Sequence, residues 1–292
     1  MNMQAIISLI GEQPIPNLLP IRYFSLNYTI YPVFVHTSRT EDIGKRLQGI
    51  FKGELRKVEP YNLVAIENDL EELVNKLGEL GYKITLNITG GTKPMSLAAF
   101  RIAERYKLPF FYLQSEGKKN ILYEYWFEEN SLKSSSKEIG QLLNIDLYLQ
   151  AHQGPYEEAS GFRNDFEKIV FNVLEKEVDE IKKGIRFSAH PSVEIDLVLR
   201  IGNNVGIAEV KSGGEAAKKR PLEQLITAGE ARFLGTFTSK FLIIDREYGE
   251  NNRLLAEAHR VKVIELPSVQ EGALSPEDRK KLTEVVKEEL GN

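Results

Sequence analysis

Short apolar runs and helical apolar stripes alternate through the first half of the chain. The runs predict buried strands at Ala5–Ile10, Thr29–His36, Asn62–Ile66, Lys83–Ile88, Pro109–Leu113 and Ile121–Phe127. Between them, apolar positions three and four residues apart predict amphipathic helices at about Glu41–Arg56, Asp69–Leu80 and Pro94–Tyr106. Apolar strands separated by such helices indicate an α/β fold with a mostly parallel, doubly wound sheet, whose ligands bind at the carboxyl ends of the strands.

The pattern weakens after Phe127, where a polar, Ser-rich stretch predicts a surface linker. A helix from Tyr156 to Lys176 then opens a second domain. The other elements expected there are a hairpin at Glu194–Lys211, helices at about Pro221–Phe233, Arg253–His259 and Pro276–Leu290, and strands at Lys240–Asp245 and Lys262–Leu266. The sequence thus predicts a first domain at residues 1–130, a linker at 131–155 and a second domain at 156–292.

Composition narrows the class of protein. A length of 292 residues suggests about two domains, and 42% hydrophobic residues supply a core for each. The chain has no cysteine, which excludes disulfides and thiolate zinc sites and fits a reducing cytoplasm. No stretch approaches about 18 apolar residues, so we expect no membrane span. The net charge is −4, so a nucleic-acid surface must be local, with candidates at Lys182, Lys183, Arg186 and Lys218–Arg220.

Three polar side chains share one face of the predicted hairpin. Asp196 lies on its first strand, while Glu209 and Lys211 lie two residues apart on the second. With a loop at Asn203-Asn204, Asp196 stands opposite Lys211 and diagonal to Glu209. Two carboxylates and an ammonium in this arrangement can hold a divalent cation and activate a water against a phosphodiester. The alternative is a surface turn with a cross-strand Asp–Lys pair.

The helix before the hairpin carries a third acid. At about 100° per residue, Val170, Phe171 and Leu174 lie within about 60° of Glu167, which therefore belongs to the apolar face. A buried carboxylate is unfavourable unless it is paired or binds a metal. Either Glu167 joins the hairpin acids, or it snorkels or pairs with an arginine such as Arg163.

Mg²⁺ or Mn²⁺ suits these groups because both ions prefer oxygen ligands and retain several waters. Asp196, Glu209 and the Val210 carbonyl are the expected ligands, with Glu167 nearby. The metal would polarise the scissile phosphate and lower the pKa of a bound water. Lys211 would position that water or neutralise the charge that develops on the phosphate.

The sequence Asp196 followed by Glu209-Val210-Lys211 resembles the D…ExK core of the PD-(D/E)xK, restriction-endonuclease-like nucleases, with Glu167 matching the acid of their first helix. This resemblance implies an α/β domain with a mixed sheet and a metal-dependent endonuclease. The segment Pro221–Ile226 is similar to the helix that follows the core in that family. Gln224 is therefore expected to support the site or contact the substrate.

In the first domain, Thr89-Gly90-Gly91-Thr92-Lys93-Pro94-Met95 joins a predicted strand to a predicted helix. The two glycines allow an anion to approach the backbone closely, and the amide groups at a helix N-terminus favour negative charge. Neither G-x-x-x-x-G-K-[ST] nor G-x-G-x-x-G is present, so ordinary nucleotide binding is not indicated. The alternative is a purely structural turn between strand and helix.

Two further polar loops follow the first and second strands, at Gly11–Pro20 and at His36–Thr40. Since all three loops leave strands at the same sheet edge, we expect them to converge on one polar, phosphate-rich ligand. The residues expected to contact that ligand are Gly11, Gln13, Pro14, Asn17, Thr37, Ser38, Arg39, Thr89, Gly90, Gly91, Thr92, Lys93 and Met95.

These loops resemble the CARF domain, the CRISPR-associated Rossmann-fold sensor of cyclic oligoadenylates, over about residues 1–130. Together with the PD-(D/E)xK segment, the whole chain resembles the ancillary nucleases of type III CRISPR systems. The resemblance implies a homodimer that binds a ring, usually cyclic tetra-adenylate, across its two-fold axis. It further implies that the dimer then cleaves DNA, RNA or both without sequence specificity.

Three alternatives remain open at this point. In the first alternative, the protein is a cyclic-oligoadenylate-binding regulator with an inactive second domain. In the second, it is a constitutive repair or restriction nuclease. In a third reading, the first domain also degrades its own ligand, assisted by Lys93 and Ser38.

Overall fold

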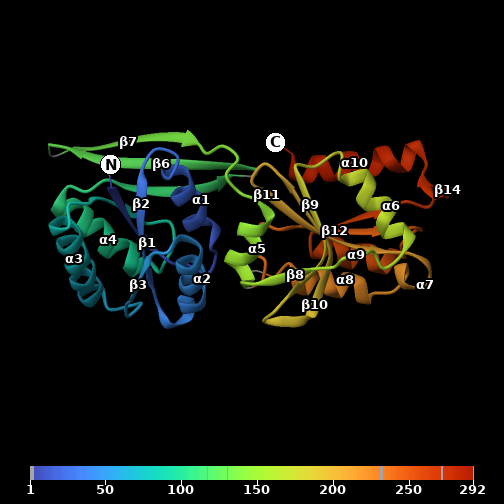
Figure 1. The fold of residues 1–292 in the computed structure, drawn as a ribbon, viewed down its shortest axis with the longest axis horizontal. Helices are drawn as coiled ribbons and strands as arrows, with labels where there is room; N and C mark the ends of the chain where they lie inside the picture. Colours follow the sequence, from blue (N-terminus) through green and yellow to red (C-terminus); the bar gives the residue numbers. More distant parts are fainter. Residues whose placement is uncertain (1–2, 117, 130, 231–232, 271, 292) are drawn as a thin grey trace. The chain divides into compact units, whose positions relative to one another are not determined.

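The computed structural model describes residues 3–116, 118–129, 131–230, 233–270 and 272–291. The chain divides into two compact units, Met1–Leu142 and Leu143–Asn292. Each unit has its own sheet with helices packed against it (Figure 1). The expected α/β fold is therefore confirmed.

The sheet of the first unit is mostly parallel, as predicted. Its strand order in the described residues is β3-β2-β1-β4-β5-β6-β7, with the first five strands parallel and the last two antiparallel. The strands are β1 Met3–Leu9, β2 Thr29–His36, β3 Glu54–Lys57, β4 Lys83–Asn87, β5 Phe110–Glu116, β6 Lys119–Glu128 and β7 Ser131–Glu138.

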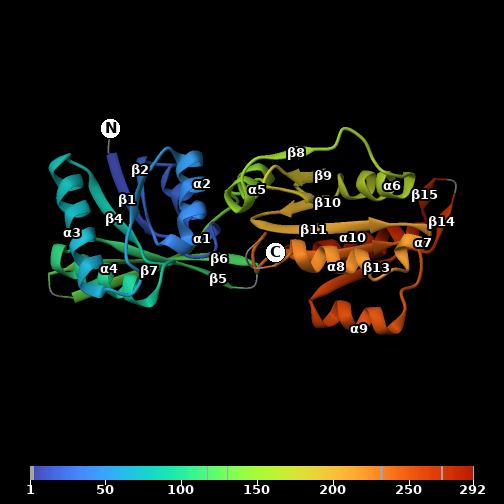
Figure 2. The same ribbon diagram turned by 90° about the horizontal axis from the view of Figure 1, so that it is seen from below.

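Helices cover both faces of this sheet (Figure 2). One face packs on α3 (Leu63–Glu79) and α4 (Lys93–Tyr106), with Ile7 and Leu9 of β1 in the shared core. The other face carries α1 (Ile15–Phe24) and α2 (Glu41–Phe51), and the short helix η1 (Ser38–Thr40) precedes α2. The carboxyl ends of β1, β2 and β4 lead directly into α1, η1 and α4.

The second unit is built on a mixed sheet in the order β13-β12-β11-β10-β9-β8. Its strands are β8 Tyr156–Glu158, β9 Glu180–Phe187, β10 His190–Ile201, β11 Asn204–Lys211, β12 Ser239–Ile244 and β13 Val261–Glu265. Strands β8 to β11 pair antiparallel, whereas β11, β12 and β13 are parallel. A small antiparallel pair, β14 (Val269–Gln270) and β15 (Ala273–Leu274), follows β13.

The helices of the second unit surround this sheet. They are α5 Ile145–Gln153, α6 Asp165–Leu174, α7 Gly213–Ala216, α8 Arg220–Ala228, α9 Glu250–Ala258 and α10 Pro276–Leu290. Helices α6 and α10 cover the face that carries Leu197, Leu199 and Val210, and they form one core with it. No described helix of either unit has the length and apolarity that a membrane crossing requires.

One predicted strand is wrong. The apolar run Asn62–Ile66 opens helix α3 instead, because the Asn62 side chain accepts a hydrogen bond from the Ala65 amide (3.1 Å) and caps the first turn. The buried positions Ile66, Leu70 and Leu73 then follow the helical period.

Several other boundaries also differ from the prediction. Helix α2 ends at Phe51, because Lys52 adopts a left-handed conformation and the chain turns into β3. The expected helix from Tyr156 begins instead at Asp165, after the Asn164 cap. The loop expected at Gly11–Pro20 gives way to α1 at Ile15. Helix α8 ends at Ala228, and residues 231–232 of the helix expected there lie outside the described residues. The segment expected to be a linker holds β7 and α5.

Candidate functional site

Three polar loops converge at the carboxyl ends of the parallel strands in the first unit. A Cβ on Gly11 would lie 3.4 Å from the Gly91 amide nitrogen and 3.5 Å from the Gly90 Cα, so the first and third loops are in contact. Arg39, on η1, forms an ion pair with Glu12 of the first loop. The structure therefore brings together the three loops that the sequence singled out.

The loop between β4 and α4 depends on its glycines. A Cβ on Gly90 would lie 2.3 Å from the Leu9 carbonyl oxygen, and Gly91 has a φ of 80°. Only glycine fits the first position, and the second has the left-handed conformation that glycine favours. Thr92 is the N-cap of α4, and Lys93 is exposed at the first turn beside it. A cation thus faces solvent at this helix N-terminus, where the helix dipole also favours negative charge.

Some of the expected ligand contacts also help to build the loops. Asn87, at the end of β4, donates a hydrogen bond from Nδ2 to the Asn17 Oδ1 (3.2 Å) and accepts one from the Thr89 hydroxyl (2.7 Å). The Thr89 Oγ1 in turn accepts from the Leu113 amide (2.8 Å). Asn17 and Met95 are fully buried. The sequence prediction did not include Asn87, although an asparagine at the end of an otherwise apolar strand is a signal that could have identified it.

The remaining expected contacts lie nearer the surface or within the loops. Ser38 and Arg39 are exposed, Gln13 is half-buried, and Pro14 and Thr37 are buried. A residue that sequence reasoning missed lies beside them. The Thr92 hydroxyl donates to the Pro60 carbonyl oxygen (2.6 Å), so the loop that carries Tyr61 is held against the glycine loop. The Tyr61 side chain is 78% exposed there.

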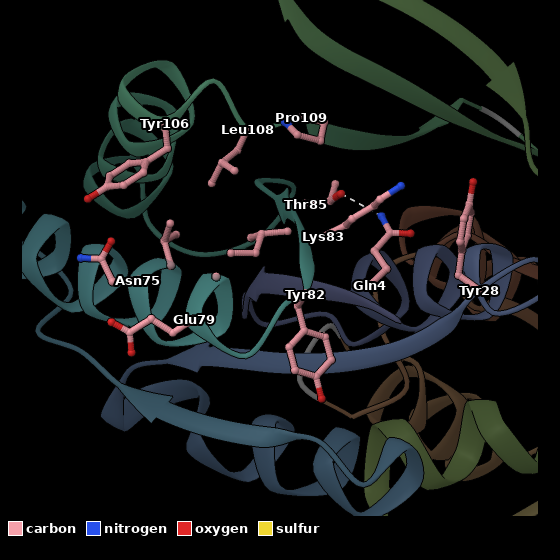
Figure 3. A pocket seen from close by; sticks show the side chains of 13 residues that line it. Gln4, Tyr28, Asn75, Glu79, Tyr82, Lys83, Thr85, Tyr106, Leu108 and Pro109 are labelled. Atoms are coloured by element: carbon pink, nitrogen blue, oxygen red, sulfur yellow. Dashed lines mark hydrogen bonds between the residues drawn. The ribbon is translucent and has the colours of Figure 1, made fainter. Parts of the chain in front are cut away.

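A cavity of about 760 Å³ lies at the opposite edge of the same sheet (Figure 3). Gln4, Lys83 and Thr85 line it from the amino ends of β1 and β4, and Gln4 Nε2 donates to Thr85 Oγ1 (2.8 Å). The cavity is therefore remote from the three loops.

In the second unit, the hairpin of β10 and β11 is tighter than predicted. Ile201 pairs with Asn204, so the two-residue loop is Gly202-Asn203 and not Asn203-Asn204. Gly202 has a φ of 61°, as the first central residue of a type II′ turn requires. This one-residue shift of the loop places Asp196 opposite Glu209 and diagonal to Lys211, which corrects the predicted register.

The three polar groups nevertheless share one face and contact one another. Lys211 Nζ donates to Asp196 Oδ2 and lies 2.7 Å from Glu209 Oε2. The Val210 amide also donates to Asp196 Oδ2 (2.9 Å). The carboxylate there takes the place of a backbone carbonyl of the neighbouring strand. Both carboxylates are buried, and only 14% of the Lys211 side chain is exposed. One buried ammonium thus bridges two buried acids.

Burial makes this cluster electrostatically strained. Desolvation and the charge of Asp196 raise the pKa of Glu209 to about 8. Desolvation alone would lower the pKa of Lys211, but the charges of Glu209 and Asp196 outweigh it and raise that pKa. Among the described residues, Glu209 Oε2 has no well-aligned hydrogen-bond donor, although Lys211 lies within ion-pair distance. The site therefore holds more negative charge than one lysine satisfies.

Glu167 is buried on α6, as its wheel position predicted, and burial raises its pKa. Its Oε2 accepts a hydrogen bond from the backbone amide of Arg163 (3.1 Å), so part of its role is to fix the start of α6. Helix α6 covers the face of Val210, whereas strand alternation puts Asp196 and Glu209 on the other face. Glu167 therefore approaches the acids from a different side.

The expected supporting groups are less engaged. Gln224 is half-buried on α8, and no hydrogen bond in the described structure joins it to the acids. Of the basic candidates, Lys183 lies over the Phe162 ring at 5.0 Å, while Lys218 and Lys219 pair with Glu215 and Glu223. Arg186 pairs with Glu194 near the acids.

We tested whether these groups suit a divalent cation. No set of three or more His, Asp or Glu side chains within the described ranges forms a ready-made metal cage. Mg²⁺ and Mn²⁺ do not require one, since they bind through one or two carboxylates and keep several waters. Asp196, Glu209 and the Val210 carbonyl fit that pattern, and the incompletely satisfied Glu209 Oε2 is the group that a cation would satisfy.

Comparison with known proteins gives two kinds of match. The family model described as the Card1 CARF domain matches residues 5–148. No curated protein sequence matches the chain. The structural matches extend over both units.

Three solved structures have folds similar to this chain. Protein VC1899 from Vibrio cholerae has a TM-score of 0.78 at 13% identity and covers 98% of each chain. Can2 from Sulfobacillus thermosulfidooxidans, solved with cyclic tetra-adenylate, has a TM-score of 0.70 at 14% identity, covering 97% of this chain and 96% of Can2. A type III CRISPR defence DNA nuclease activated by cyclic oligoadenylate has a TM-score of 0.61 at 13% identity. The match covers 97% of this chain but only 52% of that nuclease.

Proposed function

Residues 5–148 match the CARF domain, and from this premise we propose that the chain is a metal-dependent endonuclease switched on by a cyclic oligoadenylate in type III CRISPR antiviral defence. In this proposal, residues 1–130 sense the ligand and residues 156–292 cleave DNA, RNA or both without sequence specificity. The similarity to Can2, solved with cyclic tetra-adenylate, and to a type III CRISPR DNA nuclease activated by cyclic oligoadenylate supports this pairing of a sensor with a nuclease.

One observation carries the catalytic part of the proposal. The buried Asp196, Glu209 and Lys211 occupy one face of a hairpin, where a structural role would favour apolar side chains. Replacing such a group by apolar residues is often neutral or stabilising, so the fold itself has little need of it. A buried, charged cluster of this composition is therefore better explained by chemistry than by packing.

The residues have distinct roles in the proposed reaction. Asp196, Glu209 and the Val210 carbonyl would hold Mg²⁺ or Mn²⁺, and Glu167 would add negative charge from the α6 side. The cation, when bound, lowers the pKa of a coordinated water and stabilises charge on the scissile phosphate. Lys211, released from its two acids, neutralises charge on the attacked phosphate. Gln224 is proposed to support this arrangement.

The proposed activator is cyclic tetra-adenylate, which the loops around Gly90 and Gly91 bind in a homodimer. A two-fold symmetric ring matches a pocket made from two copies of the same loops. Exposed Lys93 and Arg39 supply cations for its phosphates, and the positive end of the α4 dipole lies beside Lys93. To activate, the ring must bind more tightly to the cleavage-competent state than to the resting state.

The deciding experiment incubates supercoiled plasmid, single-stranded DNA and single-stranded RNA with the protein and Mn²⁺, with and without cyclic tetra-adenylate. We expect cleavage that depends on the ligand and is abolished by EDTA or by Asp196→Asn. Lys93→Ala, which leaves the second unit unchanged, should raise the ligand concentration needed for activation.

Each failure has a separate meaning. Equal cleavage with and without the ring would remove the sensor and favour a constitutive nuclease. Ring binding by calorimetry without cleavage of any substrate would remove the nuclease and favour a regulatory protein. Chromatography of the ring after incubation decides whether the first unit degrades its own ligand.

A further inference from the structure

Arg163 contacts three acids of the second unit, Glu167, Asp196 and Glu194, from a position just before α6. Its backbone amide donates to Glu167 Oε2 (3.1 Å), and its guanidinium Nη1 donates to Asp196 Oδ1 (3.2 Å). The Asn164 cap holds the adjacent backbone through the Glu167 amide (2.9 Å). The Arg163 side chain is 46% exposed, whereas that of Asp196 is 1% exposed. The Arg163 side chain therefore extends from the buried acids to the solvent.

Glu194 keeps the Arg163 guanidinium in place. It lies two residues before Asp196 on β10 and so on the same face of the strand. Its Oε2 accepts hydrogen bonds from Arg186 (2.8 Å from Nε) and forms an ion pair with Arg163 Nη2. The Glu194 side chain is only 13% exposed. One carboxylate therefore holds two guanidinium groups beside the acids.

Both oxygens of Asp196 are engaged in this arrangement. Oδ2 accepts from the Val210 amide and from Lys211, and Oδ1 accepts from Arg163. A cation that takes Asp196 must compete with the two side chains. The pair with Arg163 is the weaker one, because its guanidinium is half exposed and its bond is longer.

A guanidinium released from Asp196 would remain at the mouth of the site, since Glu194 still binds it. Its planar fork matches two oxygens of a phosphate, which an ammonium does not. A nucleic-acid backbone reaching the acids would meet this group before any other described cation that contacts Asp196, because Lys211 is largely buried.

We propose that Arg163 exchanges partners during catalysis: it neutralises Asp196 in the metal-free protein and binds a substrate phosphate once a divalent cation has taken Asp196. This inference rests on the proposed nuclease function and adds a substrate-binding residue to it. It makes two predictions of opposite sign, because the same side chain competes with the metal and favours the substrate.

The first test is calorimetric titration of Mn²⁺ into the full-length protein without nucleic acid. Arg163→Ala keeps the backbone amide that fixes Glu167, so we expect a folded variant. It should bind Mn²⁺ roughly two- to fivefold more tightly, the range that loss of one half-exposed ion pair allows. Arg253→Ala is the matched control. Arg253 lies on α9 of the same unit, its side chain is 44% exposed, and it forms an ion pair with Glu265. Its Mn²⁺ affinity should equal that of the wild type.

The second test is steady-state cleavage with Mn²⁺ and cyclic tetra-adenylate. Arg163→Ala should raise KM for DNA or RNA about tenfold, as expected for loss of a phosphate contact of about 1–2 kcal/mol, and Arg163→Lys should restore part of it. Arg253→Ala should leave KM unchanged. A general folding defect would not tighten metal binding while weakening substrate binding.

The outcomes separate this inference from the function on which it rests. If the wild type binds Mn²⁺ and cleaves, but Arg163→Ala matches Arg253→Ala in both tests, the exchange is refuted and the nuclease stands. Weaker Mn²⁺ binding by Arg163→Ala would also refute it and would make Arg163 a purely structural group. A wild type that neither binds Mn²⁺ nor cleaves would refute the proposed function itself.

Discussion

At the scale of single residues, the second unit contains an ammonium shared by two buried carboxylates. Lys211 contacts both Asp196 and Glu209, and all three groups are removed from bulk water. The three charges are not equivalent for stability. Removing the lysine leaves Glu209 without a cation and Asp196 with only the half-exposed Arg163, whereas neutralising Glu209 relieves repulsion between the acids and keeps the pairs of Asp196 intact.

We therefore expect two variants of this cluster to differ strongly in their effect on stability. Lys211→Ala should lower the free energy of unfolding of the second unit by up to about 3–5 kcal/mol, the effect of leaving buried charge unpaired. Glu209→Gln should cost less than about 0.5 kcal/mol, or should stabilise, although it abolishes cleavage. Urea denaturation followed by circular dichroism measures both.

Glu257→Gln is the control, because Glu257 is exposed on α9 of the same unit. It should leave both stability and cleavage as in the wild type. A Glu209→Gln variant that is destabilised as strongly as Lys211→Ala would show that Glu209 serves the fold, and the catalytic assignment would lose its main support.

The residues of this cluster could be named from the sequence, but their partners could not. Alternation along a hairpin is enough to put Asp196, Glu209 and Lys211 on one face. The contact between Arg163 and Asp196 joins residues 33 positions apart. It depends on where the chain before α6 runs over the sheet, which no local pattern encodes. The same holds for Tyr61, whose loop is tied to the glycine loop by Thr92.

At the scale of elements, the predictions from sequence succeeded for the strongly periodic strands and failed where a turn or a helix cap decided the structure. The continuous apolar strands and the glycine loop were foreseen because their periodicity and composition are strong signals. The run Asn62–Ile66 was not, because four apolar positions fit a strand and a helical first turn equally well. Only the Asn62 cap distinguishes the two. The predicted hairpin register was wrong because the two-residue loop was placed one residue too far along the chain. Gly202, Asn203 and Asn204 all suit a turn, so the sequence does not decide between the two positions.

The junction between β4 and α4 offers a test at this scale. Gly90→Ala places a Cβ 2.3 Å from the Leu9 carbonyl oxygen and 2.8 Å from the Gly11 amide nitrogen. Both are backbone atoms, so the loop itself must move away from the first loop. We expect a loss of about 1–3 kcal/mol in the stability of the first unit and at least a tenfold loss of affinity for cyclic tetra-adenylate by calorimetry.

Gly78→Ala is the matched control for that substitution. Gly78 lies within α3, and a Cβ there would meet no atom within 4 Å. Alanine should therefore stabilise the helix by about 0.5–1 kcal/mol and leave ligand binding unchanged. Unaltered ligand affinity in Gly90→Ala would mean that the close contact between the first and third loops is not part of the ligand site.

At the scale of the whole molecule, the chain consists of two units with separate sheets and separate cores. Because each unit has its own sheet and core, we expect two thermal transitions. The proposed activation requires more than two stable units, because a ligand bound to one must change the equilibrium of the other.

Differential scanning calorimetry with cyclic tetra-adenylate measures that coupling directly. At a ligand concentration of about 100 times Kd, binding stabilises the ligand-bearing unit by about 2.7 kcal/mol, so its transition should move to higher temperature. If the ring also acts on the nuclease, the transition of the second unit, identified by its response to Lys211→Ala, should shift as well. The Gly90→Ala variant should show neither shift.

A shift confined to the first unit would show that ring binding leaves the stability of the second unit unchanged. It would refute activation through a change in the folded state of the second unit. Sedimentation in the same buffer, which should give one ring for every two chains, completes the test of the proposed dimer.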